Sequence, residues 1–170
     1  MIELSLKQFV PSDVCLKCDG CCRYKHADSI WRPKLGAEDQ LSLGVLVTAS
    51  DVLDERGYIK TIQNCGEHFC RFLKGADNTC GIYSKRPFDC SLYPFIISQV
   101  QGFVKVYVHL SCPYVQDHLS RPDYDAHVEY LKGFFHRPEI RDFLYRNKAM
   151  FHDYSVYAPE LLHLFDLSYL

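Results

Sequence analysis

The stretch Cys15-Leu16-Lys17-Cys18-Asp19-Gly20-Cys21-Cys22 places four cysteines within eight residues. Two cysteines separated by two residues can turn both sulfurs toward one centre, because a tight turn or a first helical turn brings them together. Cys21 repeats this interval, and CxxCxxC is the ligand spacing that opens ferredoxin-type sites for a [4Fe–4S] cluster. Adjacent side chains diverge, so Cys21 and Cys22 are expected to serve different centres, unless Cys22 stays unligated. The motif predicts an irregular fold built around metal.

Further cysteines downstream supply partners for the first four. Together they make eight thiols, which is two sets of four. A metal that takes four thiolates fits such a chain twice, or one cluster leaves a second set for another ion or for redox chemistry. The predicted metal ligands are Cys15, Cys18, Cys21, Cys22, Cys70, Cys80, Cys90 and Cys112.

The charge around these cysteines is positive although the whole chain carries a net charge of −2. Four thiolates around zinc or around an oxidised [4Fe–4S] cube leave a net charge of about −2, which nearby cations stabilise. Between residues 15 and 25 and between residues 70 and 90 there are seven basic residues against three acidic ones, a local charge of +4: Lys17, Arg23, Lys25, Arg71, Lys74, Lys85 and Arg86 against Asp19, Asp77 and Asp89.

The composition limits the classes of protein to be considered. A chain of 170 residues with 48% hydrophobic residues suits one folded domain. The small net charge gives no basic field, so we expect no nucleic-acid partner and no membrane partner. The first residues do not resemble a secretory signal, and the apolar runs are too short to span a bilayer. We therefore expect a cytoplasmic protein, in which structural disulfides are rare.

The hydrophobic pattern predicts an α+β fold with two short β-hairpins. One hairpin is expected over residues 95–110, turning at Gln101-Gly102, and another over residues 69–83, turning at residues 75–78. Helices are expected over residues 39–56, over residues 123–136, from Pro138 onward and from Pro159 onward. In the first of them, Asp51, Asp54 and Glu55 are expected on a solvated face. We expect residues 1–170 to form a single domain, with a cysteine-rich metal-binding region (12–115) packed on helices and a helical C-terminal extension (120–170).

The cysteine blocks together resemble a known family. CxxCxxCC at residues 15–22, Cys70-Arg71-Phe72-Leu73, Cys80-Gly81-Ile82-Tyr83, Arg86-Pro87-Phe88-Asp89-Cys90 and Cys112-Pro113 are similar to the YkgJ-type CxxCxxCC family of zinc- or iron-chelating domains. The resemblance covers residues 12–115 and implies a metal-binding or iron–sulfur protein. Cys65 matches no block of the family pattern, so we expect it to be a small buried hydrophobe or an idle thiol.

Three functions remain open. The first is a protein that holds an iron–sulfur cluster, [4Fe–4S], for electron transfer or sensing, with a redox or other protein partner. The second is a zinc-binding structural or interaction module. The third and weaker one is an enzyme that uses a thiol pair such as Cys21-Cys22. No nucleotide-binding or other catalytic motif is visible, so the sequence favours a non-enzymatic metal-binding protein.

Overall fold

The computed structural model describes residues 6–18, 20–44, 49–74 and 78–170. Its contacts divide the chain into two compact units. We call residues 11–91 the cysteine unit, and residues 1–10 with 92–170 the sheet unit. Each is described by itself, and a single domain over residues 1–170 stays a prediction. The α+β class is confirmed, because small antiparallel sheets occur together with helices.

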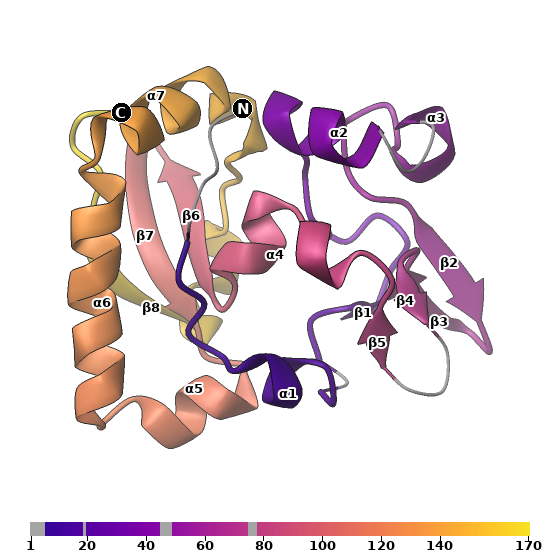
Figure 1. Ribbon diagram of the computed structural model, residues 1–170, viewed down its shortest axis with the longest axis horizontal. Coiled ribbons are helices and arrows are strands. Elements are labelled where there is room, and N and C mark those ends of the chain that lie inside the picture. The colour runs from indigo at the N-terminus through magenta and orange to yellow at the C-terminus, as the bar shows by residue number, and fades with distance from the viewer. Residues whose placement is uncertain (1–5, 19, 45–48, 75–77) are drawn as a thin grey trace. The chain divides into compact units, whose positions relative to one another are not determined.

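The sheet unit is built on a three-stranded antiparallel sheet in the order β6-β7-β8 (Figure 1). Strands β6 (Phe95–Val100) and β7 (Phe103–His109) form the hairpin expected over residues 95–110. Its turn residues Gln101 and Gly102 have φ values of 50° and 85°. Two left-handed residues match the right-handed twist of the flanking strands, so this two-residue turn is favourable.

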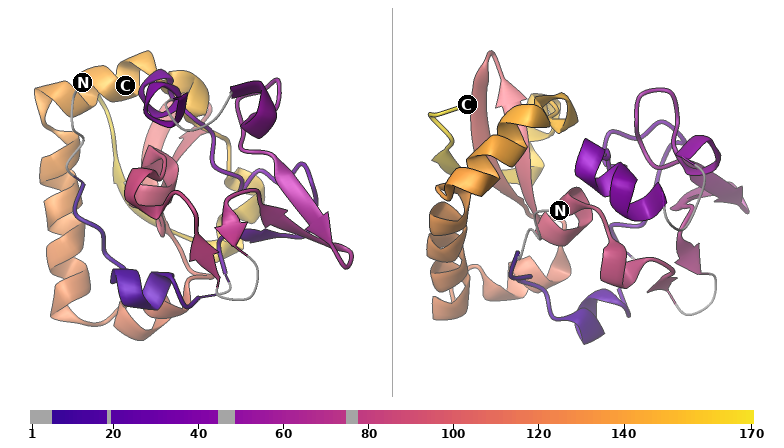
Figure 2. Two further views of the ribbon diagram at one scale, coloured as in Figure 1. Left: turned by 45° about the vertical axis from the view of Figure 1, so that its right-hand side comes forward. Right: turned by 45° about the horizontal axis from the view of Figure 1, so that its top comes forward.

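Proline is the first residue of each α-helix that the structure describes in the sheet unit. The helices are α5 (Pro113–His118), α6 (Pro122–Phe135) and α7 (Pro138–Arg146). Proline suits a first helical position because its fixed φ is already helical and its missing N–H is not needed there. The helices expected over residues 123–136 and from Pro138 are confirmed, and Figure 2 shows α6 and α7 beside the sheet.

The helix expected from Pro159 is wrong. The chain there passes through two 3₁₀ helices, η3 (Lys148–Met150) and η4 (Ser155–Glu160), into strand β8 (Leu161–Asp166). Leu162 pairs with Val108 and Phe165 with Val106, so apolar residues of the tail extend the sheet. A short apolar run fits a strand or a helix equally well, and here pairing with β7 decides.

An aromatic cluster fills the interior of the sheet unit. The imidazole of His127 stacks on Phe95 with centroids 5.2 Å apart and lies 5.0 Å from the ring of Phe9. His127 is only 5% exposed. Burial lowers the pKa of His127 to about 4, because the ring has little water to stabilise its charged form.

The cysteine unit consists of short elements. It begins with α1 (Ser12–Cys15) and contains α2 (Ala37–Gly44) and α3 (Ala49–Val52). Its last elements are the 3₁₀ helix η2 (Tyr83–Lys85) and α4 (Phe88–Leu92), which ends at the start of the sheet unit. The second expected hairpin is confirmed as β4 (Leu73–Lys74) paired with β5 (Thr79–Cys80), and residues 75–77 of its turn lie outside the described residues.

A small sheet in the cysteine unit was not expected from the sequence. Its order is β1-β3-β2, from β1 (Arg23–Tyr24), β2 (Thr61–Asn64) and β3 (Glu67–Cys70). Cys70 therefore ends a strand of this sheet and does not lie on the first strand of the β4–β5 hairpin, where the sequence analysis had put it. The missed signal is the pair Cys65-Gly66, whose left-handed φ values of 51° and 84° make the β2–β3 turn.

The helix expected over residues 39–56 is only partly right. Described helix covers residues 37–44 and 49–52, and residues 45–48 lie outside the described residues. Beyond them Leu53 pairs with Ile59, so residues 53–59 turn back as a loop. Asp54 forms this turn, because its carboxylate accepts the backbone N–H groups of Arg56 at 2.9 Å and Tyr58 at 3.0 Å.

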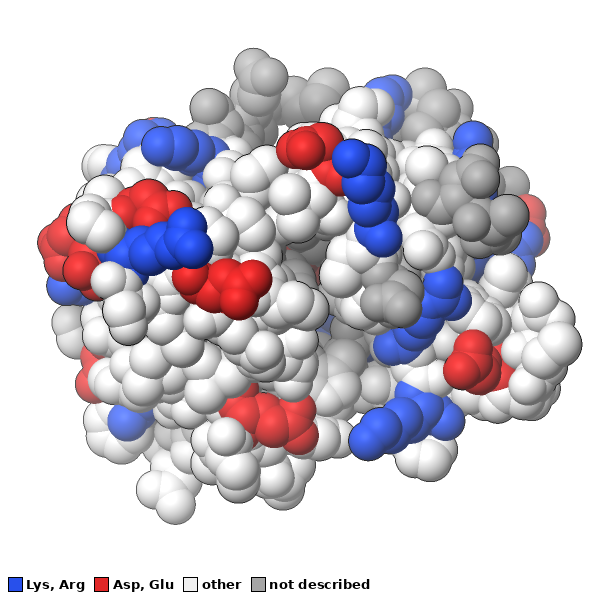
Figure 3. Space-filling view, turned by 90° about the horizontal axis from the view of Figure 1, so that it is seen from below, with Lys and Arg blue, Asp and Glu red and all other residues white. Residues whose placement is uncertain are grey.

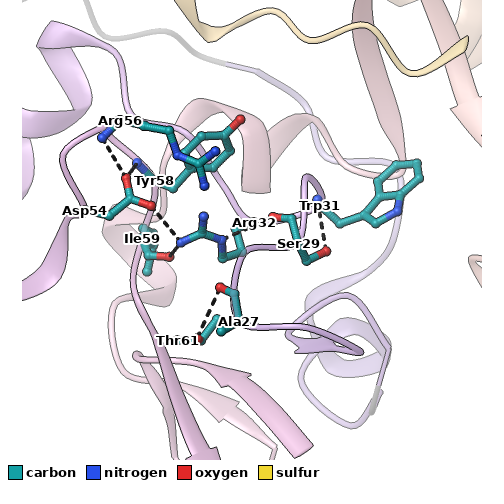
Figure 4. Close-up of polar contacts among 9 residues, drawn as sticks. All are labelled: Ala27, Ser29, Trp31, Arg32, Asp54, Arg56, Tyr58, Ile59 and Thr61. Atoms are coloured by element: carbon teal, nitrogen blue, oxygen red, sulfur yellow. Dashed lines mark hydrogen bonds and ion pairs between the residues drawn. The ribbon is translucent and has the colours of Figure 1, made fainter. Parts of the chain in front are cut away.

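The same carboxylate also pairs with a buried arginine (Figure 4). The Nη1 atom of Arg32, a side chain only 4% exposed, lies 2.9 Å from Oδ2 of Asp54. The guanidinium carbons of Arg32 and Arg56 lie 4.7 Å and 5.3 Å from the centroid of the Tyr58 ring. Asp54 therefore has a structural role, where the sequence had suggested a solvated helix face.

In the described part of the chain, none of the helices has the length and apolar character that crossing a membrane needs.

We expect His127 to make the sheet unit less stable in acid. Its pKa of about 4 in the folded protein lies below the ordinary value of 6.5, so the unfolded chain takes up the proton first. Neutral His127 therefore contributes up to about 3 kcal/mol to the free energy of unfolding. This contribution is fully present above about pH 6.5 and is lost as the pH falls toward 4. Urea unfolding at pH 7 and pH 4.5, followed by circular dichroism, should show a larger loss for wild type than for His127→Phe. Equal losses would contradict this origin.

Candidate metal centre

The CxxCxxCC motif forms a chain of tight turns. Cys15 closes α1, and the N–H of Cys18 donates to the carbonyl of Cys15 at 3.2 Å. The N–H of Arg23 then donates to the carbonyl of Gly20 at 3.0 Å, so residues 20–23 turn again. A Cβ at position 20 would lie 3.3 Å from the sulfur of Cys18. Glycine therefore leaves room for this sulfur.

Adjacent cysteines meet in this turn, which the sequence analysis did not expect. The thiol of Cys21 donates a hydrogen bond to the sulfur of Cys22, which raises the pKa of Cys21 and lowers the pKa of Cys22. The side chains do not diverge, because the turn over residues 20–23 curls the backbone around them. Whether they serve different centres stays a prediction.

A backbone hydrogen bond joins the motif to β3. The N–H of Cys70 donates to the carbonyl of Cys22 at 2.8 Å. Cys70 is buried, and Cys22 and Cys80 are partly buried residues that pack against the same hydrophobic cluster. The core of the cysteine unit thus contains thiols from three separate blocks of sequence, packed with Tyr24, Leu35, Leu43, Ile59, Phe72, Leu73 and Ile82.

Backbone N–H groups point at two of these sulfurs. The sulfur of Cys70 accepts hydrogen bonds from the N–H groups of Phe72 and Leu73. The sulfur of Cys80 accepts one from the N–H of Ile82, two residues later as in the first case. The N–H of Gly81 donates to the carbonyl of Phe72 at 2.8 Å and ties the two turns together. Such donors stabilise negative charge on sulfur.

Four thiols interact electrostatically with one another in every pair. The pKa of Cys90 is raised by burial and by the nearby Cys22, Cys70 and Cys80. That of Cys70 is raised in the same way by Cys22 and Cys80, and that of Cys80 by Cys22. Burial raises the pKa of Cys70 to about 12 and that of Cys90 well above its usual value. In the metal-free protein the thiols of Cys70 and Cys90 therefore favour the protonated form, whereas the hydrogen bond from Cys21 lowers the pKa of Cys22. We call Cys22, Cys70, Cys80 and Cys90 the core set.

The remaining motif cysteines lie at the edge of the core set. The pKa of Cys15 is raised by burial and by the nearby Cys18 and Cys22. That of Cys21 is raised by Cys22, Cys15 and Cys90. Burial raises the pKa of Cys15, against the lowering effects of the Arg86 charge and a hydrogen bond from Tyr83. We call Cys15, Cys18 and Cys21 the motif set.

Basic residues lie close in sequence to the cysteines of both sets. The side chain of Arg23 donates to Asn78, and its guanidinium carbon lies 4.9 Å from the centroid of the Phe69 ring. Figure 3 shows Lys and Arg side chains on one face of the molecule, and the exposed ones in the cysteine unit near the cysteines are Lys17, Lys25, Arg71, Lys74 and Lys85. The local positive charge predicted from the sequence is thus present at the surface of this unit.

Two partly buried carboxylates near Cys90 are functional candidates that the sequence did not indicate. Asp89 accepts the N–H of Lys34 at 3.1 Å, and Asp39 accepts the N–H groups of Phe88 at 3.0 Å and Gly36 at 3.2 Å. Burial raises the pKa of Asp89 to about 7 and that of Asp39 to about 6. These hydrogen bonds fix the segment that carries Cys90. The only sequence signal is that Asp39 stands three residues after Gly36, the spacing at which a side chain can bond the backbone at a helix start.

Two cysteines belong to neither of these sets. Cys65 is exposed at the β2–β3 turn, and its thiol lies 3.4 Å from the side-chain oxygen of Asn64. Cys112 belongs to the sheet unit, where it is buried and precedes the first residue of α5. Its role as a ligand stays a prediction.

The donor chemistry suits a thiophilic metal. Seven of the eight predicted ligands belong to the cysteine unit, and each of the seven exerts an electrostatic effect on another or receives one, which places them near one another. Among the residues that the structure describes, no three Cys, His, Asp or Glu side chains already surround one point as ligands. Metal binding would require the thiols to lose their protons.

The comparison with protein families agrees with the cysteine pattern. Residues 14–113 match the family model described as "CxxCxxCC: Putative zinc- or iron-chelating domain". No curated protein and no solved structure matches the chain significantly. Since the matched residues make up more than half of the chain and contain both thiol sets, the protein belongs to the CxxCxxCC family of zinc- or iron-chelating domains, and metal binding is its supported property.

Proposed function

We propose that the cysteine unit binds an iron–sulfur cluster, [4Fe–4S], through cysteine thiolates and uses it for electron transfer or sensing. The observation that carries this proposal is the set of N–H groups of Phe72, Leu73 and Ile82 that donate to the sulfurs of Cys70 and Cys80. Hydrogen bonds to sulfur and exclusion of water are the protein's means of setting a cluster's reduction potential.

The proposed ligands come from both sets. The core set offers four thiols that are close enough to influence one another in every pair. The motif set contributes the CxxCxxC spacing of ferredoxin-type sites. When bound, the cluster supplies one-electron redox chemistry. The chain's own residues bind it, keep water from it through the apolar side chains around the core set, and oppose its negative charge.

Zinc is the second candidate, and the core set favours it. Four thiolates complete a closed tetrahedral zinc site, and such sites contribute directly to folding. The short elements of the cysteine unit, most of them two to five residues long, suit a fold that metal stabilises. In this case the protein would be a structural or interaction module.

A thiol-dependent redox or modification enzyme is the weakest candidate. It is supported by the hydrogen bond between Cys21 and Cys22, which lowers the pKa of Cys22. Arg23 next to the pair acts in the same direction. A thiolate is the reactive form of cysteine.

The proposed setting is the cytoplasm. Free thiols persist in a reducing compartment, whereas an oxidising one would join them as disulfides. An electron-transfer role also requires a redox partner protein, which we include in the proposal. We propose no role in binding nucleic acid or membranes.

Anaerobic purification with absorption spectroscopy and elemental analysis tests the proposal. We expect a broad band near 400 nm and about four irons and four sulfides per chain, as for a [4Fe–4S] protein. A colourless protein with one or two zinc ions would instead establish the second candidate. A protein without either metal, after purification with and without added zinc or iron, would exclude both.

A matched pair of cysteine variants tests the ligand assignment. Cys90→Ser removes a core-set sulfur, so the metal content should fall to less than half of the wild-type value. Cys65→Ser removes an exposed thiol outside both sets and should leave the metal content unchanged. The measurement is metal per chain after identical anaerobic purification. Equal metal contents in the two variants would contradict the assignment.

A further inference from the structure

One arginine of the cysteine unit is fixed against an aromatic ring beside the thiols. The guanidinium carbon of Arg86 lies 4.1 Å from the centroid of the Tyr83 ring. Tyr83 begins η2, and Arg86 follows the last residue of this helix with extended backbone angles of −62° and 146°. Stacking of a planar guanidinium on a ring restricts the arginine to one orientation, so its charge has a defined position.

Tyr83 connects this arginine to the motif set. Its hydroxyl donates a hydrogen bond to the sulfur of Cys15. The tyrosine therefore contacts the guanidinium with its ring and a thiol with its hydroxyl. One side chain sets the position of the cation and of one sulfur.

The charge of Arg86 acts on both thiol sets. Its guanidinium is stacked on Tyr83, which contacts Cys15 of the motif set, and it lies within electrostatic reach of Cys15 and of Cys80 in the core set. Arg86 is itself half-buried, so water screens its charge less than it screens an exposed lysine. Lys85, the preceding residue, is exposed and offers a control with the same charge.

We propose that Arg86, held on the ring of Tyr83, is a positioning residue whose fixed charge balances the thiolates of both sets and retains the bound metal. This inference rests on the proposed function, because it requires metal in the cysteine unit. It assigns a role to Arg86 and Tyr83, neither of which has a sulfur atom that could bind the metal.

Substitution of Arg86 by lysine separates a role of its charge from a role of its shape. If Arg86 acts through its positive charge, Arg86→Lys should retain most of the effect that Arg86→Gln loses. If it acts only by filling space against Tyr83, the two variants should behave alike. Tyr83→Phe keeps the ring and removes the hydrogen bond to Cys15, so it separates the two parts of the arrangement.

The test is the rate at which the full-length protein, purified anaerobically with its metal, loses that metal to an excess of chelator. We expect release to be about 10–100-fold faster for Arg86→Gln, the range found when groups that support metal ligands are removed. Arg86→Lys should stay within about threefold of wild type, and Tyr83→Phe should lie between Arg86→Lys and Arg86→Gln. Lys85→Gln removes an exposed charge that water screens, so it should also stay within about threefold of wild type.

The outcomes separate this inference from the proposed function. Wild-type protein that carries no metal overturns both. Metal-loaded wild type with equal release rates for Arg86→Gln and Lys85→Gln overturns the role of Arg86 alone. Equal acceleration in Arg86→Lys and Arg86→Gln also overturns it, because that result assigns the effect to shape. If Arg86→Gln does not fold, release from Arg86→Lys and Tyr83→Phe decides: accelerations of similar size in both variants overturn the charge role.

Discussion

The hydrogen bond from the N–H of Cys70 to the carbonyl of Cys22 is the contact on which the cysteine unit depends. It holds the end of β3 beside the CxxCxxCC turns, although 48 positions separate the two residues in the chain (70 − 22). The sulfurs of Cys70 and Cys80 then accept backbone N–H groups from the turns that follow them. Together with the pairing of β1 with β3, this bond fixes the two cysteine blocks relative to each other.

Burying thiols in this way has a clear physical consequence. A neutral thiol is a small apolar group and packs in a core, but a thiolate there needs a cation to offset the lost hydration. Burial raises the pKa of Cys70 to about 12, so the metal-free core favours the protonated form at neutral pH. A bound metal replaces those protons, and metal affinity should therefore fall as the pH falls. Arg86 and the N–H donors reduce the cost of forming the thiolates.

The sequence predicted those parts of the structure that local patterns determine. The turn at Gln101-Gly102 and the helices from Pro122 and Pro138 follow from local turn chemistry and helical periodicity, and the structure contains them. Strand β8 was missed because its apolar residues become a strand only by pairing with β7, a contact between distant parts of the chain. The family and its metal-binding property could be predicted because the cysteine spacing itself carries that information.

Contacts between distant residues were not predictable in the same way. Asp54 looked like part of a solvated helix face, yet it pairs with the buried Arg32. Asp39 and Asp89 gave little sequence signal, because their burial depends on how separate segments pack. The meeting of Cys21 and Cys22 depends on the curvature of one turn, which spacing alone does not give.

X-ray absorption at the edge of the bound metal shows whether cysteine thiolates hold the metal, because it identifies the atoms bonded to it. We expect the metal to be bonded to sulfur alone, at about 2.3 Å, whether it is zinc or iron. For an iron–sulfur cluster, a second shell of iron should also be present. A first shell of nitrogen or oxygen would contradict the claim that cysteine thiolates hold the metal.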